Sequence, residues 1–105
     1  MIAQTPKTPY YAVIFTSIRT ENDNDYSEMA EKMLGLARKQ EGYLGVESAS
    51  DEIGITVSYW SDLDSIKKWK MNTEHSLARE KGRSTWYKAF KTRIALVEHD
   101  YGFEK

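Results

Sequence analysis

The residue of this chain best suited to proton transfer is His75. It is one of only two histidines, and the other, His99, stands in a Glu-His-Asp triplet near the end, where we expect it to be solvent-exposed. A neutral imidazole, with a reference pKa of about 6.5, can take a proton from a phenol or from the carbon acid of an anthrone. The resulting carbanion can pass an electron to O₂. The competing interpretation is that His75 packs at a helix kink and hydrogen-bonds a backbone carbonyl.

Trp60 ends a predicted strand on which Ser58 and Thr56 share its face. Small polar side chains beside an indole are suited to a cavity for a flat aromatic ligand, since the ring stacks and the hydroxyls orient the ligand. Ordinary core packing of Trp60 between helix and sheet is equally compatible with the pattern. Trp69, on the apolar face of a predicted helix, fits core packing better, although it could also form a second wall.

Arg93, on the last predicted strand, could neutralise a developing enolate or a carboxylate. The alternative is a solvated or salt-bridged edge residue. Trp86 and Tyr87 could form a lid or part of a subunit interface, and Tyr59 and Tyr11 fit subunit packing better than chemistry. The candidate catalytic residues are therefore His75, Trp60 and Arg93, and the candidate substrate-binding residues are Ser58, Trp69, Trp86 and Tyr87.

Composition excludes several classes of function. The chain has 105 residues, enough for one domain, and is 40% hydrophobic and 30% charged, which is typical of a globular protein. Its formal net charge is −1, without a basic block, so a nucleic-acid partner is not expected. With no cysteine and only two distant histidines, we expect no disulfide and no metal site, and we place the chain in the cytoplasm. No segment approaches the roughly 20 apolar residues of a membrane span.

The hydrophobic pattern predicts six elements. Residues 10–19 are a strand with apolar side chains at both parities, so both of its faces should be covered. A helix begins near Asp25, with Glu28 completing a capping box, and runs to about Lys39. Strands over 43–50 and 53–60 form an antiparallel hairpin around Asp51-Glu52. Ser61 and Asp64 cap a second helix, kinked and ending at Gly82. A short turn at 84–87 and a last strand over 91–101 follow.

The order βαββαβ predicts an α+β, ferredoxin-like fold, in which a four-stranded antiparallel sheet carries both helices on one face. The other face stays apolar, and a twofold-related copy is the simplest cover for it. We expect residues 1–9 to form a flexible arm rather than a signal peptide, residues 10–101 to form the domain, and residues 102–105 to form a tail.

Four stretches of this sequence together resemble the antibiotic biosynthesis monooxygenase domain family. They are E-G-Y-L-G-V-E (41–47), G-I-T-V-S-Y-W (54–60), W-K-x-N-x-E-H-x-x-A (69–78) and G-R-x-x-W-Y (82–87). The resemblance implies a dimeric α+β barrel with a pocket between sheet and helices in each protomer. Some members there oxygenate phenolic or polycyclic substrates with O₂, without metal or flavin, and others degrade haem.

This chain departs from the haem-degrading branch, whose members resemble it around Trp60 and Trp69. That branch uses an Asn on the first strand and a His further along the second helix, whereas residues 10–19 hold no Asn and the matching helical position is Arg79. Three hypotheses remain open. The first is a cofactor-independent monooxygenase of a small aromatic or quinol substrate, and the second is a dimer that binds haem or a hydrophobic metabolite without turnover. The third is a structural dimer whose pocket is filled by Trp60 and Trp69.

Overall fold

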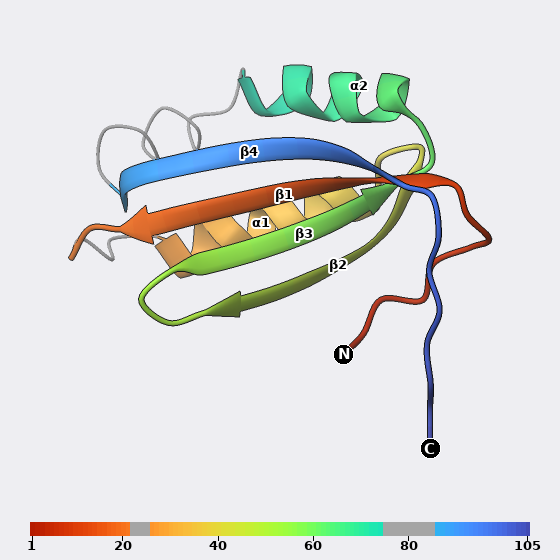
Figure 1. Ribbon diagram of the computed structural model, residues 1–105. Coiled ribbons are helices and arrows are strands. Elements are labelled where there is room, and N and C mark those ends of the chain that lie inside the picture. The colour runs from red at the N-terminus through yellow and green to blue at the C-terminus, as the bar shows by residue number, and fades with distance from the viewer. Residues whose placement is uncertain (22–25, 75–85) are drawn as a thin grey trace.

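The computed structural model describes residues 1–21, 26–74 and 86–105. Its elements follow the predicted order βαββαβ (Figure 1). They are β1 (Tyr10–Arg19), α1 (Tyr26–Arg38), β2 (Tyr43–Ser50), β3 (Gly54–Trp60), α2 (Leu63–Glu74) and β4 (Tyr87–Val97). Within these residues, no helix is both long enough and apolar enough to cross a bilayer.

The four strands form one antiparallel sheet in the order β2-β3-β1-β4, and α1 crosses behind it (Figure 1). Directly paired residues point to the same face. Tyr11 pairs with Trp60, whose ring stacks on Trp69 of α2, so this row of residues lies on the helix side. Tyr26 of α1 packs against Tyr87 on the same side. The predicted α+β fold, with both helices on one face, is confirmed.

The opposite face of the sheet, which we call the open face, carries the other parity of each strand. Ile14 pairs with Val57, and Thr16 pairs with Ile55, so these side chains share it. Ile55 keeps 44% of its surface exposed, and Ile18 and Ile53 are similarly exposed. At one end the N-terminal arm lies against this face, where the Ala3 N–H donates to Glu47 Oε2 at 2.9 Å. Neither α1 nor α2 covers the remainder, which carries Ile14, Ile18, Ile55 and Val57 together with Thr16 and Arg93.

The last strand differs from its prediction at both ends. It runs from Tyr87 to Val97 rather than over 91–101. The Val97 end follows from the register, since Val97 pairs with Tyr10 and the next partner would be Pro9, which has no N–H to donate. The earlier start at Tyr87 follows from a register shift after Ile18 that brings Arg19 opposite Tyr87.

The second helix also begins later than predicted. Asp62 rather than Ser61 is its cap, because Asp62 Oδ1 accepts the Ser65 N–H at 2.7 Å, while the Ser61 hydroxyl donates to Asp62 Oδ2. These hydrogen bonds hold the pKa of the Asp62 carboxyl below its usual range, that from the Ser65 N–H most strongly. The predicted kink, the end at Gly82, the cap at Asp25 and most of the turn at 84–87 lie outside the described residues.

Gly42, which follows α1, is the position where the fold most needs a glycine. Its φ is +86°, and a Cβ there would lie 2.1 Å from Ser65 Oγ and 2.5 Å from Ser65 Cβ. Left-handed backbone costs a non-glycine residue about 1–2 kcal/mol, and the overlap with α2 adds to that. At Gly35, inside α1, an added Cβ would have no neighbouring atom within 4 Å.

Gly42→Ala is therefore expected to lower the free energy of unfolding by roughly 2–4 kcal/mol. Gly35→Ala is the matched control and should raise it by about 0.5–1 kcal/mol, because alanine favours helix over glycine. Urea unfolding at one fixed protein concentration measures both variants. Equal stability of the two variants would show that the α1–β2 turn is not built as described.

Candidate functional site

Trp60 lies at the centre of an aromatic cluster at one end of the helix side, the Trp60 cluster, formed with Tyr43 and Trp69. The Trp60 ring stacks on Trp69 with centroids 6.0 Å apart, and Tyr43 meets it edge-on at 5.7 Å. Its indole N–H donates to Ser58 Oγ at 2.9 Å. Trp60 is 0% exposed, so no water-sized space touches it. Trp60 therefore packs in the core in this structure and does not line a cavity, and the Ser58 hydroxyl is already bonded to it.

A second aromatic group, the Tyr87 cluster, lies at the other end of the helix side. Tyr26 packs edge-on against both Trp86 and Tyr87, at 5.5 and 6.0 Å between centroids. Phe15 lies 5.5 Å from both Tyr87 and Phe90. Trp86 is buried, whereas Tyr26 and Tyr87 are half-buried. This cluster therefore offers aromatic surface that is still partly accessible.

Two phenols and one cation give the Tyr87 cluster its chemistry. The Tyr87 hydroxyl donates to the Tyr26 hydroxyl at 3.3 Å, and Arg19 Cζ lies 3.3 Å from the centre of the Tyr26 ring. Burial, followed by the hydrogen bond to Tyr26, raises the pKa of Tyr87 well above its ordinary value, although the Arg19 charge opposes the shift. The Tyr87 phenol therefore stays protonated at neutral pH. Tyr26, which accepts that hydrogen bond, retains a hydroxyl that can itself donate.

From Trp60 towards Tyr87, the helix side of the sheet is lined by two rows of side chains, which we call the floor and which reach the Tyr87 cluster at Phe15. The register places them in two rows, Val46-Ser58-Val13-Ile94 and Ser48-Thr56-Phe15-Thr92. The first row therefore has one hydroxyl among apolar groups, and the second has three hydroxyls beside the Phe15 ring. Ile94 and Thr92 on β4 are exposed, so the floor is open to solvent along that strand. An aromatic ligand lying here would meet apolar contacts and hydroxyls together.

The structure divides the residues that the sequence placed in one site. Trp60, Ser58 and Trp69 meet in one cluster, whereas Trp86 and Tyr87 meet in the other. Tyr11 pairs with Trp60, whereas Phe15, the member of the Tyr87 cluster nearest to it on β1, is four residues further along, or about 13 Å at strand spacing. His75 lies outside the described residues.

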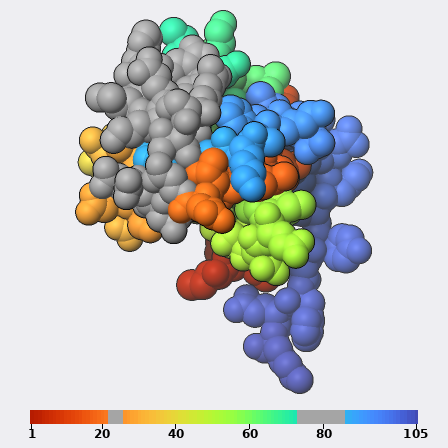
Figure 2. Space-filling model, turned by 90° about the vertical axis from the view of Figure 1, so that its left-hand side faces the viewer, coloured from red at the N-terminus to blue at the C-terminus, as the bar shows by residue number. Residues whose placement is uncertain are grey.

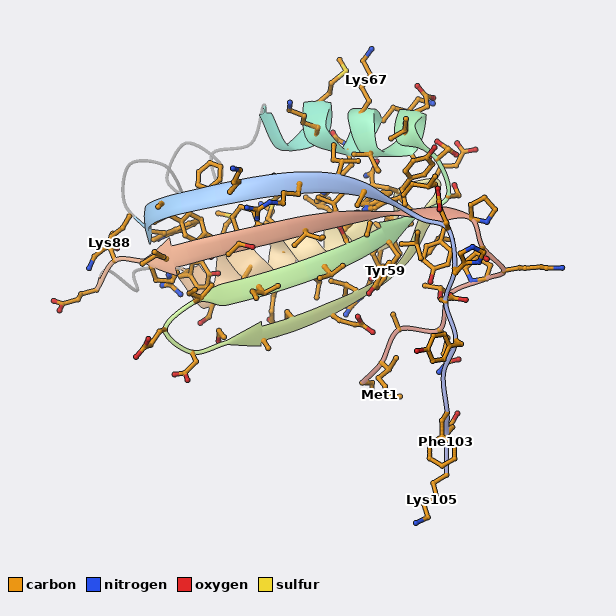
Figure 3. The ribbon with its side chains drawn as sticks, in the orientation of Figure 1. Met1, Tyr59, Lys67, Lys88, Phe103 and Lys105 are labelled. Carbon is orange, nitrogen blue, oxygen red and sulfur yellow. The ribbon has the colours of Figure 1, made fainter. Side chains whose placement is uncertain are left out.

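Arg93 and the two tyrosines expected at a subunit interface, Tyr59 and Tyr11, lie on different faces of the sheet. Arg93 pairs with Ile14, so it is on the open face, with the sheet between it and Trp60. The structure therefore does not bring Arg93 together with Trp60, and its role in a site stays a prediction. Tyr59 does lie on the open face (Figure 3), where its hydroxyl donates to Glu47 Oε1 at 2.7 Å. Tyr11 shares the helix side with Trp60 instead.

Four members of the Tyr87 cluster were not among the residues predicted for the site, namely Phe15, Arg19, Tyr26 and Phe90. In the sequence, Tyr26 stands out only as one apolar position of the predicted helix, and Phe15 as one apolar position of the first predicted strand. The sequence held one signal for them, which is that aromatic residues gather near two strand ends. Phe15, Arg19 and Tyr26 lie near the end of the first predicted strand, and Trp86 and Tyr87 lie just before the start of the last one. The antiparallel pairing of β1 with β4, which ends with Arg19 opposite Tyr87, brings the two ends together.

Several solved structures share this fold. SnoaB, a cofactor-independent oxygenase from Streptomyces nogalater, superimposes with a TM-score of 0.69 and 7% identity over 93% of this chain and 100% of its own. A Nitrosomonas europaea protein provisionally assigned as an antibiotic biosynthesis monooxygenase gives 0.67 and 9%, over 89% and 91% of the two chains. PA3566 from Pseudomonas aeruginosa gives 0.66 and 17%, over 90% and 97%.

These likenesses, at such low identities, define the fold, which is that of the antibiotic biosynthesis monooxygenase type, and they confirm the resemblance found in the sequence. No protein-family model matches the chain. At the level of sequence, the chain belongs to the same family as the uncharacterized protein YqjZ of Bacillus subtilis strain 168. The two are 50% identical over 106 residues, covering 99% of this chain and 93% of YqjZ.

Proposed function

We propose that the protein is a cofactor-independent monooxygenase that oxidises a small aromatic or quinol-type substrate on the floor between the two aromatic clusters. The observation that carries this proposal is the fold it shares with SnoaB, a cofactor-independent oxygenase. One fold hosts many functions, so the activity needs its own test. The proposed reaction turns a ring CH₂ and O₂ into a ring C=O and water, and the substrate itself supplies the electrons.

In the proposed reaction, His75 is the base that removes the C–H proton, and the carbanion reduces O₂. Charge then develops on the substrate's ring oxygen. The Tyr26 hydroxyl, which accepts a hydrogen bond from the Tyr87 hydroxyl at an O···O distance of 3.3 Å, donates to that oxygen in the proposed reaction. Arg19, over the Tyr26 ring, favours the negative charge. Thr56 and Val13 form the part of the floor on which the ring rests.

His75→Ala is expected to reduce the rate of O₂ uptake with anthrone about 10²- to 10⁴-fold, the usual contribution of a general base. His99→Ala is the matched control, since His99 is exposed in the C-terminal segment, and its rate should equal that of the wild type. An oxygen electrode measures all three proteins. An unchanged rate in His75→Ala would remove the proposed base.

A wild-type chain that consumed no O₂ with any anthrone or quinol would overturn the proposed activity. If haem titration then gave a Soret band, and reductant gave no degradation product, the protein would be assigned to binding without turnover. Neither outcome would change the fold or the description of the two clusters.

We also propose that the protein works in the cytoplasm as a homodimer whose two sheets pack with their open faces together. The exposed side chains of Ile18 and Ile55 on the open face support this, because exposed apolar surface on a small domain calls for a cover. Twofold symmetry presents the same surface from both copies, so an apolar face matches itself. The absence of cysteine fits a reducing compartment.

A further inference from the structure

We propose that the C-terminal tail, residues 101–105, packs against a second copy of the chain rather than against its own protomer. Its two aromatic residues are as exposed as in a free peptide, Tyr101 at 101% and Phe103 at 87%. Figure 3 places Phe103 and Lys105 at the far end of the tail, away from every strand and helix. Two bare aromatic side chains in one short extended segment are costly in water and fit a protein contact surface.

The root of the tail is fixed to the body, so the tail leaves in a defined direction. The Tyr10 hydroxyl donates to Asp100 Oδ2 at 2.5 Å and accepts from the Thr5 hydroxyl at 3.0 Å. The hydrogen bond to Asp100 raises the pKa of Tyr10 most strongly. The hydrogen bond from Thr5 lowers it and burial raises it, so the net shift is upward. Tyr10 itself is buried and packs edge-on against Tyr59 on the open face. The anchor therefore lies at the edge of the open face.

The direction of the tail indicates that its contact partner is a second copy of the chain. Figure 2 shows α1 on one flank of the body and the dark blue tail descending on the other, which is the side of the open face. This inference rests on the proposed dimer, in which the open face is covered by the partner. A tail that leaves from the rim of that face runs along the covering subunit.

Reach and area agree with this contact. Five residues past Asp100 extend about 17 Å, which is comparable to the roughly 14 Å between the outer strands of a four-stranded sheet. Each aromatic residue can bury about 150–250 Å², so two tails related by the twofold axis would add roughly 600–1,000 Å². That is a large part of the approximately 1,600 Å² of a standard stable interface.

Photo-crosslinking of the full chain tests the contact. Phe103 is replaced by p-benzoylphenylalanine in one variant and Met71, exposed on α2, in a matched control. Irradiation should give a covalent product at twice the 12.2 kDa chain mass from the Phe103 variant and none from the Met71 variant. The double variant Tyr101→Ser, Phe103→Ser should weaken dimerisation roughly 10- to 100-fold by sedimentation, as the loss of anchoring aromatic residues usually does.

Each alternative outcome has a distinct meaning. A chain that sediments as a dimer but crosslinks only within one protomer, or not at all, would overturn the tail contact and leave the open-face dimer standing. A chain that sediments as a monomer at micromolar concentration would overturn both. Equal dimer affinity of the double serine variant and the wild type would also count against the tail.

Discussion

Trp60→Ala is expected to lower the free energy of unfolding by about 3–5 kcal/mol, the range found when a fully buried aromatic side chain is truncated. Trp60 is 0% exposed and contacts the rings of Tyr43 and Trp69, so its removal leaves a cavity and loses two aromatic pairs. Each such pair contributes roughly 0.5–1.5 kcal/mol beyond area burial. The Ser58 hydroxyl also loses its donor.

Urea unfolding followed by far-ultraviolet circular dichroism measures this effect, since fluorescence would itself change with the loss of an indole. Trp69→Ala is the matched control. Because Trp69 is only half-buried, its truncation should cost distinctly less. A cost below about 1 kcal/mol for Trp60→Ala would mean that Trp60 is not part of a packed core. It would restore Trp60 as a possible wall of a ligand cavity.

Ile55→Asp is expected to raise the dissociation constant of the dimer by roughly a thousandfold. Burying an unpaired carboxylate costs several kcal/mol, and the twofold axis places two of them in the same interface. Ile55 is suited to this test because it lies on the open face of β3, opposite Thr16 of β1, and is 44% exposed in the single chain. The substitution therefore leaves the folded protomer largely undisturbed.

Leu63→Asp is the control for this variant. Leu63 begins α2 on the helix side, and its exposed fraction, 53%, is close to that of Ile55. Sedimentation velocity across the micromolar range should show a dimer for the wild type and for Leu63→Asp, and a monomer for Ile55→Asp. If both aspartate variants remained dimeric, the subunits would have to associate through another surface.

Much of the fold was predictable because the chain's pattern is local. Alternation over residues 53–60 placed Ile55 and Val57 on one face and Ser58 and Trp60 on the other, and the register confirms both sets. The end of the last strand was not predictable in this way. It depends on which residue of β1 faces Val97, and a pairing between segments some 80 positions apart leaves no trace in either segment alone.

The candidate site was harder to predict than the fold, and for a related reason. Residue types indicated that the tryptophans and hydroxyls could hold an aromatic ligand, but not which of them would satisfy one another. Trp60 and Ser58 do so, through the indole N–H, and that pairing leaves Trp60 in the core. The face of Arg93 could not be predicted either, because it depends on the register of β4 against β1, which pairs Arg93 with Ile14.

The structure favours the Tyr87 end of the sheet for the proposed chemistry. The accessible aromatic surface belongs to Tyr26 and Tyr87, where two hydroxyls and the Arg19 guanidinium lie together. The floor connects this cluster to the packed Trp60 end and is open along β4. A substrate ring is therefore expected to lie nearer to Phe15 than to Trp60.

Sedimentation equilibrium of the unmodified chain is the most direct test of the proposed homodimer. Both the covering of the open face and the contact of the C-terminal tail depend on a second subunit. At micromolar concentration we predict a particle of twice 12.2 kDa. A single species of 12.2 kDa at that concentration would mean that Ile18, Ile53 and Ile55 stay in water, and would contradict the account.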